Sequence, residues 1–325
     1  MIELGPRLIL SVLAALWALI LVTLCALALV HAVRIVRSRR RARLDLRARP
    51  LVIRYALDDE ADPALGETLR LTTGALGDRV DERLLSVLET LRGEARERIA
   101  TMLVERGHPQ RLRRRARSGR TTVRAAAVRR LGQLALPDDA VLVAAAVHDR
   151  APIVRTIAVR AVASYPSAAM VETVLEQLRG NGEVPSLAIV TSLIDQGSRS
   201  PEALRAIRAG LGDDRAAVRA SCAQALGELT SAADADRLGL LLRRDPTPSV
   251  QLAAATALER VGRASSVPAL LEATRSPWGP VRAHALQALL ALPRDVTTEA
   301  LAEVSGRGDA LLAPLLPAAD PAPGS

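Results

Sequence analysis

Residues 214–229 read DRAAVRASCAQALGEL, and residues 246–261 read PTPSVQLAAATALERV, a similar pattern of small and aliphatic residues 32 positions later. In the first stretch Val218, Cys222 and Leu226 stand four residues apart. Offsets of four and eight place three residues on one face of an α-helix. The second stretch fills the same positions with Val250, Ala254 and Leu258. The pair of stretches therefore predicts an amphipathic helix that recurs along the chain.

This pattern recurs seven times at spacings of 28 to 33 residues. A second amphipathic segment precedes each copy, as in RLLSVLETL at 83–91 and ADRLGLLLR at 235–243. One helix pair cannot bury its apolar face alone, so the sequence predicts that the pairs stack into an all-α solenoid of about seven helix pairs. The aliphatic position is filled by Leu103, Leu131, Val162, Leu193, Leu226, Leu258 and Leu289.

Composition agrees with closely spaced helices. Hydrophobic residues make up 49% of the 325 residues and aromatic residues only 1%, with no Phe. The core must therefore be built from Ala, Leu and Val, and no sustained period-2 run of β-branched residues predicts strands. The two cysteines, Cys25 and Cys222, lie far apart in apolar helical contexts and predict neither a disulfide framework nor a metal site.

The repeat resembles the HEAT repeat, in particular its short bacterial, phycobilisome-lyase-like form. Such repeats often carry Asp in the turn between the two helices and Arg six residues later. Asp149 and Arg155 match this pattern, as do Asp213 and Arg219. The unit near 180–197 departs most from it. Variants of the pair are Ser118/Arg124, Ser276/Arg282 and Asp245/Gln251. The resemblance implies that these residues cap the second helix and tie turns together, which is a structural role.

The N-terminal part contains 23 uncharged residues, 8–30, LILSVLAALWALILVTLCALALV. A helix of that length is about 35 Å long and can cross a hydrocarbon core of roughly 30 Å. Residues 34–49, which come next, hold eight Arg and one Asp. The positive-inside rule then puts the N-terminus outside and the rest of the chain in the cytoplasm, at the inner membrane. A cleaved signal peptide is the alternative, but the apolar run exceeds the usual length of its hydrophobic region.

The sequence thus predicts four parts. Residues 1–49 form a single-pass transmembrane anchor with an Arg-rich flank. Residues 50–80 form a juxtamembrane connector with one or two short helices or, as an alternative, an irregular first repeat. Residues 81–306 form the solenoid, and the Pro- and Ala-rich residues 307–325 form a disordered tail.

A second basic cluster lies within the solenoid, where residues 106–130 contain ten Arg and no acidic residue. Like charges at this density repel each other and are not needed for packing. The cluster predicts contact with anionic lipid, with an acidic protein surface or with nucleic acid. The absence of nearby aromatic residues that could stack on bases disfavours nucleic acid as the target. The candidate interaction patch comprises Arg111, Arg113, Arg114, Arg115, Arg117 and Arg120.

The sequence contains no pattern that predicts catalysis, a cofactor or a metal. His31, His108, His148 and His284 lack metal-binding spacing, and phosphate-loop and nucleophile-elbow motifs are absent. One HEAT-repeat enzyme class, the deoxyhypusine hydroxylases, holds a di-iron centre with His-Glu dipeptides, and this chain has none. Cys222 occupies a position that is Ala in other repeats, which indicates a core residue.

These observations predict a non-enzymatic scaffold that binds a protein partner at the membrane. Trp278, in the turn Ser276–Pro280, is the candidate partner contact, since Trp is enriched among binding hot spots. Two alternatives are a solenoid that binds nucleic acid or anionic lipid through residues 106–130, and an accessory subunit of a membrane enzyme.

Overall fold

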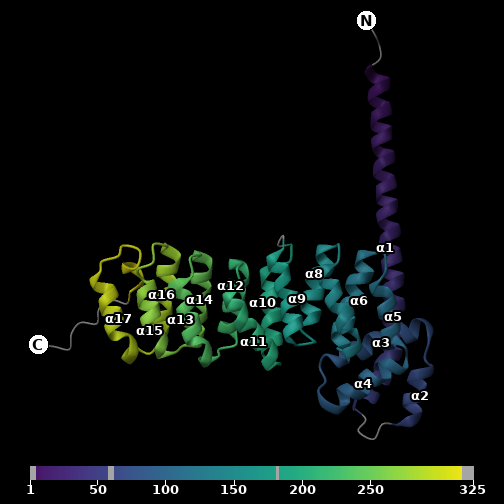
Figure 1. The fold of residues 1–325 in the computed structure, drawn as a ribbon. Helices are drawn as coiled ribbons and strands as arrows, with labels where there is room; N and C mark the ends of the chain where they lie inside the picture. The colour runs from purple at the N-terminus through teal and green to yellow at the C-terminus, as the bar shows by residue number, and fades with distance from the viewer. Residues whose placement is uncertain (1–4, 58–61, 181–182, 317–325) are drawn as a thin grey trace, which may run out of the picture. The chain divides into compact units, whose positions relative to one another are not determined.

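The computed structural model describes residues 5–57, 62–180 and 183–316. Within these ranges the chain is helical and contains no strand. It divides into two compact units (Figure 1): unit 1, residues 1–108, and unit 2, residues 109–325.

Unit 1 contains the helices α1 (Gly5–Leu57), α2 (Pro63–Leu71), α3 (Gly74–Leu88) and α4 (Gly93–Glu105). Within α1 the apolar segment from residue 15 to residue 30 is exposed throughout. Among the described residues, α1 is the one helix long and apolar enough to cross a membrane, and a signal sequence would pass the same test.

The C-terminal part of α1 extends further than expected. The predicted connector begins at residue 50, but α1 continues through Pro50 to Leu57. Pro50 lacks an N–H and removes one helical hydrogen bond. Packing against α3 offsets that loss, because Ala48 and Val52 are almost fully buried on this side of α1. Tertiary contact thus continues a helix that Pro50 alone would have ended.

The remaining boundaries of the connector also shift. The solenoid is predicted to begin at residue 81, yet Asp81 lies in the middle of α3, where it is buried. Helices α3 and α4 form the first repeat-like pair, and this pair belongs to unit 1.

Unit 2 is a row of antiparallel helix pairs (Figure 1), in each of which a first helix is followed by a second helix. The first helices are α5 (His108–Ala116), α7 (Ala140–Ala145), α9 (Ala168–Arg179), α11 (Pro201–Ala209), α13 (Ala235–Arg244) and α15 (Val267–Ala273). The second helices are α6 (Thr121–Leu134), α8 (Pro152–Val162), α10 (Ser186–Gly197), α12 (Ala216–Glu228), α14 (Pro248–Val261) and α16 (Gly279–Ala291). Helix α17 (Arg294–Gly306) comes next, and short 3₁₀ turns occur at 137–139, 146–148, 210–212, 232–234, 264–266 and 313–315.

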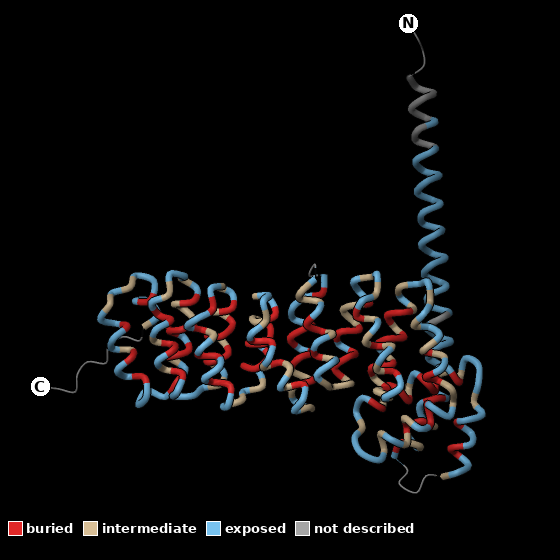
Figure 2. Tube along the Cα trace, viewed as in Figure 1, coloured by how far each residue is buried: buried red, intermediate tan, exposed pale blue. Residues whose placement is uncertain are grey.

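The core follows the predicted periodicity. All seven residues of the aliphatic position, from Leu103 on α4 to Leu289 on α16, are fully buried. The residues four positions earlier are buried as well, and Figure 2 shows the buried segments gathered where helices face each other. Eight positions earlier the pattern weakens: Val218 is buried, but Pro185 is exposed and Val123 is half-buried. The prediction of a helical repeat is confirmed at its two strongest positions.

Two glycines allow second helices to approach each other closely. A Cβ atom on Gly132 of α6 would lie 2.6 Å from Cβ of Ala161 on α8, and a Cβ atom on Gly227 of α12 would lie 2.6 Å from Cα of Ala257 on α14. Such distances are too short for real carbon atoms. Small residues here therefore set the spacing between neighbouring repeats.

The tail that was predicted to be disordered from residue 307 is folded over the described residues 307–316. Leu312 is almost fully buried against Leu286 of α16 and Val304 of α17. Arg307 donates from Nη1 to Oγ1 of Thr274 at 2.8 Å. Residues 307–316 thus cover the end of the solenoid core, because an open last repeat would leave Leu286 in water. Residues 317–325 lie outside the described residues.

Candidate interaction surfaces

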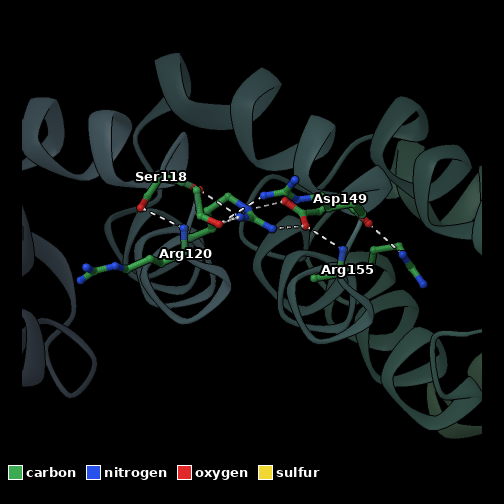
Figure 3. Close-up of polar contacts among 8 residues, drawn as sticks. Ser118, Arg120, Asp149 and Arg155 are labelled. Atoms are coloured by element: carbon green, nitrogen blue, oxygen red, sulfur yellow. Dashed lines mark hydrogen bonds and ion pairs between the residues drawn. The ribbon is translucent and has the colours of Figure 1, made fainter.

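The turn between the two helices of each repeat is tied to the turn of the next repeat by one arginine. Arg124 of α6 donates from Nη1 to the carbonyl of Ser118, in its own turn, at 2.9 Å. Its Nε and Nη2 each donate to the carboxylate of Asp149, in the next turn, at 2.8 Å. Asp149 also accepts from the N–H of Ala151 at 2.9 Å. Figure 3 shows this sequence of contacts from Ser118 to Arg155. We call the series of such contacts the turn ladder.

The turn ladder has a second run at the other end of unit 2. It runs through four turn residues, Asp213, Asp245, Ser276 and Asp309. Each of the first three is linked to the next turn by the side chain that stands six residues after it in the sequence. These side chains are Arg219, Gln251 and Arg282. The tie between turns expected from the Asp/Arg pattern is therefore confirmed, and Gln251 replaces arginine without ending the run. The expected capping is not observed on α8 and α12, because Asp149 and Asp213 accept from the N–H of the N-cap residue and no side chain bonds an N–H of the first helical turn.

The ladder is interrupted at α10. Arg155 ion-pairs with Glu183 and donates to the carbonyl of Asp149, but the residue six positions after Glu183 is the buried Ile189. Asp213 instead accepts from Arg179, the last residue of α9, at 2.6 and 2.9 Å. The departure near 180–197 in the sequence thus corresponds to a change in which helix supplies the linking arginine.

The ten arginines of residues 106–130 do not form one patch. Arg106 lies in unit 1, where its buried side chain donates from Nε to Asp81 at 2.5 Å. Arg124 belongs to the turn ladder, and Arg113 donates from Nε to the fully buried Asp139 at 2.5 Å. The acidic partners come from the following helix pair or from α3, so the local sequence alone does not show them.

Other arginines of the predicted patch are exposed. No ion pair links any of them to an acidic side chain within the described ranges. Arg150, from the turn before α8, joins them and donates from Nη2 to the carbonyl of Gly119 at 3.2 Å. Sequence reasoning missed Arg150, which lies outside residues 106–130. We call this group the arginine patch: Arg114, Arg115, Arg117, Arg120 and Arg150. Arg111 and Arg113, both half-buried, do not belong to it.

The second helices of unit 2 expose a surface with few charges, here called the second-helix face. Charged residues among its exposed positions occur only toward the helix C-termini, at Arg129, Arg160, Glu228 and Arg260, and the last two form an ion pair with each other. The uncharged exposed residues are Thr122, Pro152, Ile153, Ser186, Leu187, Thr191, Ala217, Gln224, Ser249, Pro280, Gln287 and Ala291.

The first helices and α17 expose a contrasting surface. Their exposed charged residues are Arg114, Arg115, Glu172, Glu176, Glu202, Arg205, Asp236, Arg237, Arg243, Arg244, Glu272, Arg294, Asp295, Glu299 and Glu303. Charged side chains thus make up a larger share of the exposed positions on the first helices and α17 than on the second helices.

Two apolar spots lie near the start of the second helices. Ile153, the second residue of α8, is 56% exposed, and Leu187, the second residue of the neighbouring α10, is 73% exposed. Trp278, the predicted partner contact, is 50% exposed at the start of α16, and its backbone N–H donates to Ser276 Oγ at 3.3 Å. Leu311 lies against the adjoining Gly279, since a Cβ on Gly279 would be 3.2 Å from Leu311 Cδ2.

One groove of unit 2 has a volume of about 630 Å³. It is lined by residues of α11, α12, α13 and the adjoining turns, which include Arg208, Arg219 and Asp245. Arg208 is paired with the buried Asp234 at 2.7 Å, and Arg219 with Asp245. These charges hold the repeats together and are already neutralised by one another.

The cysteine of the solenoid, Cys222, is buried within α12. Burial raises the pKa of the Cys222 thiol to about 12, so the thiolate that reacts as a nucleophile is not formed near neutral pH. No group of three or more His, Cys, Asp or Glu side chains that could hold a metal ion occurs among the described residues.

Comparison with known families supports the repeat type. The family model for HEAT repeats matches residues 235–312, which span α13 to the C-terminal segment. No curated protein matches the chain.

Several solved structures are similar to the chain at low identity. Human deoxyhypusine hydroxylase in complex with glycerol is 18% identical, over 67% of this chain and 99% of that one, with a TM-score of 0.30. The complex of CpcE and CpcF of phycocyanin lyase from Nostoc sp. is 16% identical, over 70% and 94%, with a TM-score of 0.31. Kap121p bound to Pho4p is 13% identical, over 83% and 35%, with a TM-score of 0.42. At this level of likeness none of their activities transfers to this chain. The described solenoid and the family match together identify an all-α chain with HEAT repeats.

Proposed function

We propose that this protein is a membrane-anchored, cytoplasm-facing scaffold that binds a protein partner on its second-helix face. The observation that carries the proposal is the absence of charge across most of that face, next to a densely charged first-helix surface. Charged residues are depleted in the cores of protein interfaces because a charge must lose its water when the partner binds. Stacked helix pairs also offer the long continuous surface that such binding uses.

The two apolar spots give this surface its strongest anchors. Ile153 and Leu187 expose aliphatic side chains on neighbouring helices, and Trp278 with Leu311 forms an apolar spot at the other end. Burial of a Leu or Ile side chain contributes roughly 1.5–3 kcal/mol. The partner therefore presents an uncharged, apolar contact surface, and its binding depends little on salt.

Anchoring rests on α1. Its apolar segment is exposed and long enough to cross a bilayer, and the eight arginines within residues 34–49 favour a cytoplasmic position for the rest of the chain. Externally added trypsin should leave unit 2 intact in spheroplasts and should cut it in inverted membrane vesicles. The reverse pattern would contradict the proposed orientation.

The docking proposal is tested by crosslinking and affinity purification of the full chain from its own membranes. The variant carries Ile153→Glu and Leu187→Glu, and the matched control carries Val141→Glu, at a side chain that is 78% exposed on the first helix α7. We expect one dominant protein with the wild type and the control, at 0.1 M and 0.5 M salt alike, and at least a tenfold loss with the double variant. Equal recovery from all three proteins would refute the assignment of the face.

A further inference from the structure

We propose that the arginine patch binds the phosphate groups of anionic membrane lipids. This inference rests on the proposed membrane anchor, and it adds a second attachment made by unit 2 itself. It goes beyond the basic cluster in the sequence, because the structure distinguishes arginines that are ion-paired within the solenoid from arginines that are exposed to solvent.

The first step is that the charge of the patch is uncompensated. Arg113 and Arg124 are bound to Asp139 and Asp149, so neither is available to a ligand. The patch arginines are exposed, and the described chain pairs none of them with an acidic side chain. Arg117 and Arg120 flank a turn that Arg150 reaches from the next repeat through its bond to Gly119.

The second step is that this clustering is unfavourable without a ligand. Guanidinium groups close together repel one another, and among the described residues no ion pair with an acidic side chain offsets that repulsion. Figure 3 shows that the side chain of Arg120 extends away from the turn ladder and takes no part in its contacts. An anion removes the repulsion, and phosphate suits guanidinium because both nitrogens of the fork can donate to two oxygens.

The third step decides between lipid phosphate and nucleic acid. Single-stranded nucleic acid binds where aromatic side chains stack on its bases. The aromatic ring in this part of unit 2 is Tyr165, which is half-buried and donates its hydroxyl to the carbonyl of Leu131 at 3.0 Å. A chain anchored by α1 meets headgroups at high effective concentration, and each arginine near an anionic surface strengthens binding roughly fivefold.

The experiment uses the full chain in lipid nanodiscs. One set contains only phosphatidylcholine, and the other contains phosphatidylcholine with 30% phosphatidylglycerol, at 0.1 M salt. Amide hydrogen exchange is measured over residues 113–122. We expect exchange there to slow by at least threefold in the anionic discs and to recover at 0.5 M salt.

Charge-reversed variants make the test specific. The variant Arg114→Glu, Arg117→Glu, Arg120→Glu should lose the protection. The control Arg199→Glu, Arg205→Glu, Arg263→Glu changes the net charge equally at exposed positions elsewhere in unit 2 and should keep it. Equal exchange in both kinds of disc would overturn the proposal. Protection by a 20-nucleotide single-stranded DNA, but not by phosphatidylglycerol, would overturn it in favour of nucleic acid.

Failure of the anchor is measured separately. Incorporation of the protein into discs of pure phosphatidylcholine reports the spanning of α1, which does not depend on the patch. A protein that enters neutral discs but shows no protection in anionic ones keeps its anchor and lacks the lipid site. A protein that fails to enter neutral discs lacks the anchor of the proposed function.

Discussion

Arg219 on α12 binds Asp245 of the following repeat, donating from Nε to Oδ2 at 2.6 Å and from Nη2 to Oδ1 at 3.1 Å. Its Nη1 also donates to the carbonyl of Asp213 at 2.7 Å, so one guanidinium joins two successive turns. Burial acts to raise the pKa of Asp245, but the hydrogen bonds from Arg219 and from the N–H of Thr247 outweigh it, and the pKa falls below its usual value. Both charges are largely buried, which makes the loss of either one costly.

Replacement of Arg219 by Met should therefore destabilise unit 2 strongly. The change leaves Asp245 buried without its cation, and loss of one partner of a buried pair costs roughly 3–5 kcal/mol. The measurement is urea denaturation followed by circular dichroism. Arg215→Met is the control, since Arg215 is exposed on the same helix end, and we expect a change within about 0.5 kcal/mol. Equal unfolding midpoints for the two variants would show that the turn ladder adds no stability.

Acid should loosen unit 1 through Asp45. This carboxylate accepts from Nε of Arg83 at 2.6 Å and of Arg79 at 2.9 Å, and these bonds, with Arg83 the main cause, lower the pKa of Asp45 to about 2. A folded-state pKa below the unfolded value of about 3.9 stabilises the fold above pH 4, and this contribution is lost as the pH falls towards 2. Hydrogen exchange over residues 44–57, corrected for intrinsic rates, should therefore accelerate between pH 5 and pH 3.

Asp45→Asn should remove that acid dependence. Asp78→Asn, at an exposed neighbour on α3, serves as the control and should keep it. If wild type and Asp45→Asn responded to acid alike, another group would have to carry the effect.

Gly227→Ala should destabilise the solenoid even though Ala is the better helix former. Ala gains up to about 1 kcal/mol in helix propensity, but its Cβ would lie 2.6 Å from Cα of Ala257, which forces α12 and α14 apart. Overpacking of this kind costs roughly 1–3 kcal/mol. Gly306→Ala, where no atom lies within 4 Å of the added Cβ, should be neutral or stabilising. The midpoint of thermal unfolding should fall for Gly227→Ala and should stay the same or rise for Gly306→Ala.

Leu312→Ala should show that the C-terminal segment closes the solenoid. Leu312 is buried against Leu286 and Val304, and removal of a buried Leu side chain costs roughly 2–5 kcal/mol. Leu311→Ala changes an exposed neighbour and should have little effect on urea stability. The two leucines differ in burial, so similar effects would contradict the packing described for residues 307–316.

Much of the fold could be predicted from the sequence because the repeat is local. Residues four apart on one helix share a face whatever surrounds them, which is why Leu226 and Cys222 could be assigned to the core from their spacing alone. The turn hydrogen bonds of Asp149 and Asp213 are also local, since each accepts from an N–H two residues later. The Trp278 contact and the membrane topology remain predictions.

Where the structure differs from the expected boundaries, contacts between distant residues are the reason. Helix α1 continues through Pro50 into the expected connector, where α3 packs on it, and residues 307–316 pack on the last repeat through Leu312. The number of unpaired arginines in the basic cluster was overestimated, because Asp139 and Asp149 lie 26 and 25 residues after the arginines that they neutralise. A count of charges over residues 106–130 does not include acidic partners that lie that far along the sequence.

The sequence by itself determined the helices, their pairing and the faces that they bury, because helical periodicity depends only on residues up to eight positions apart. The tertiary structure decided which charges are available. Stacking places Arg113 and Arg124 against acids of the next repeat, leaves Arg114, Arg117 and Arg120 in water beside Arg150, and gathers the uncharged residues of separate helices into one face. The physical reason is that an ion pair or an interaction surface depends on distances in space, and stacking sets those distances between residues one repeat apart.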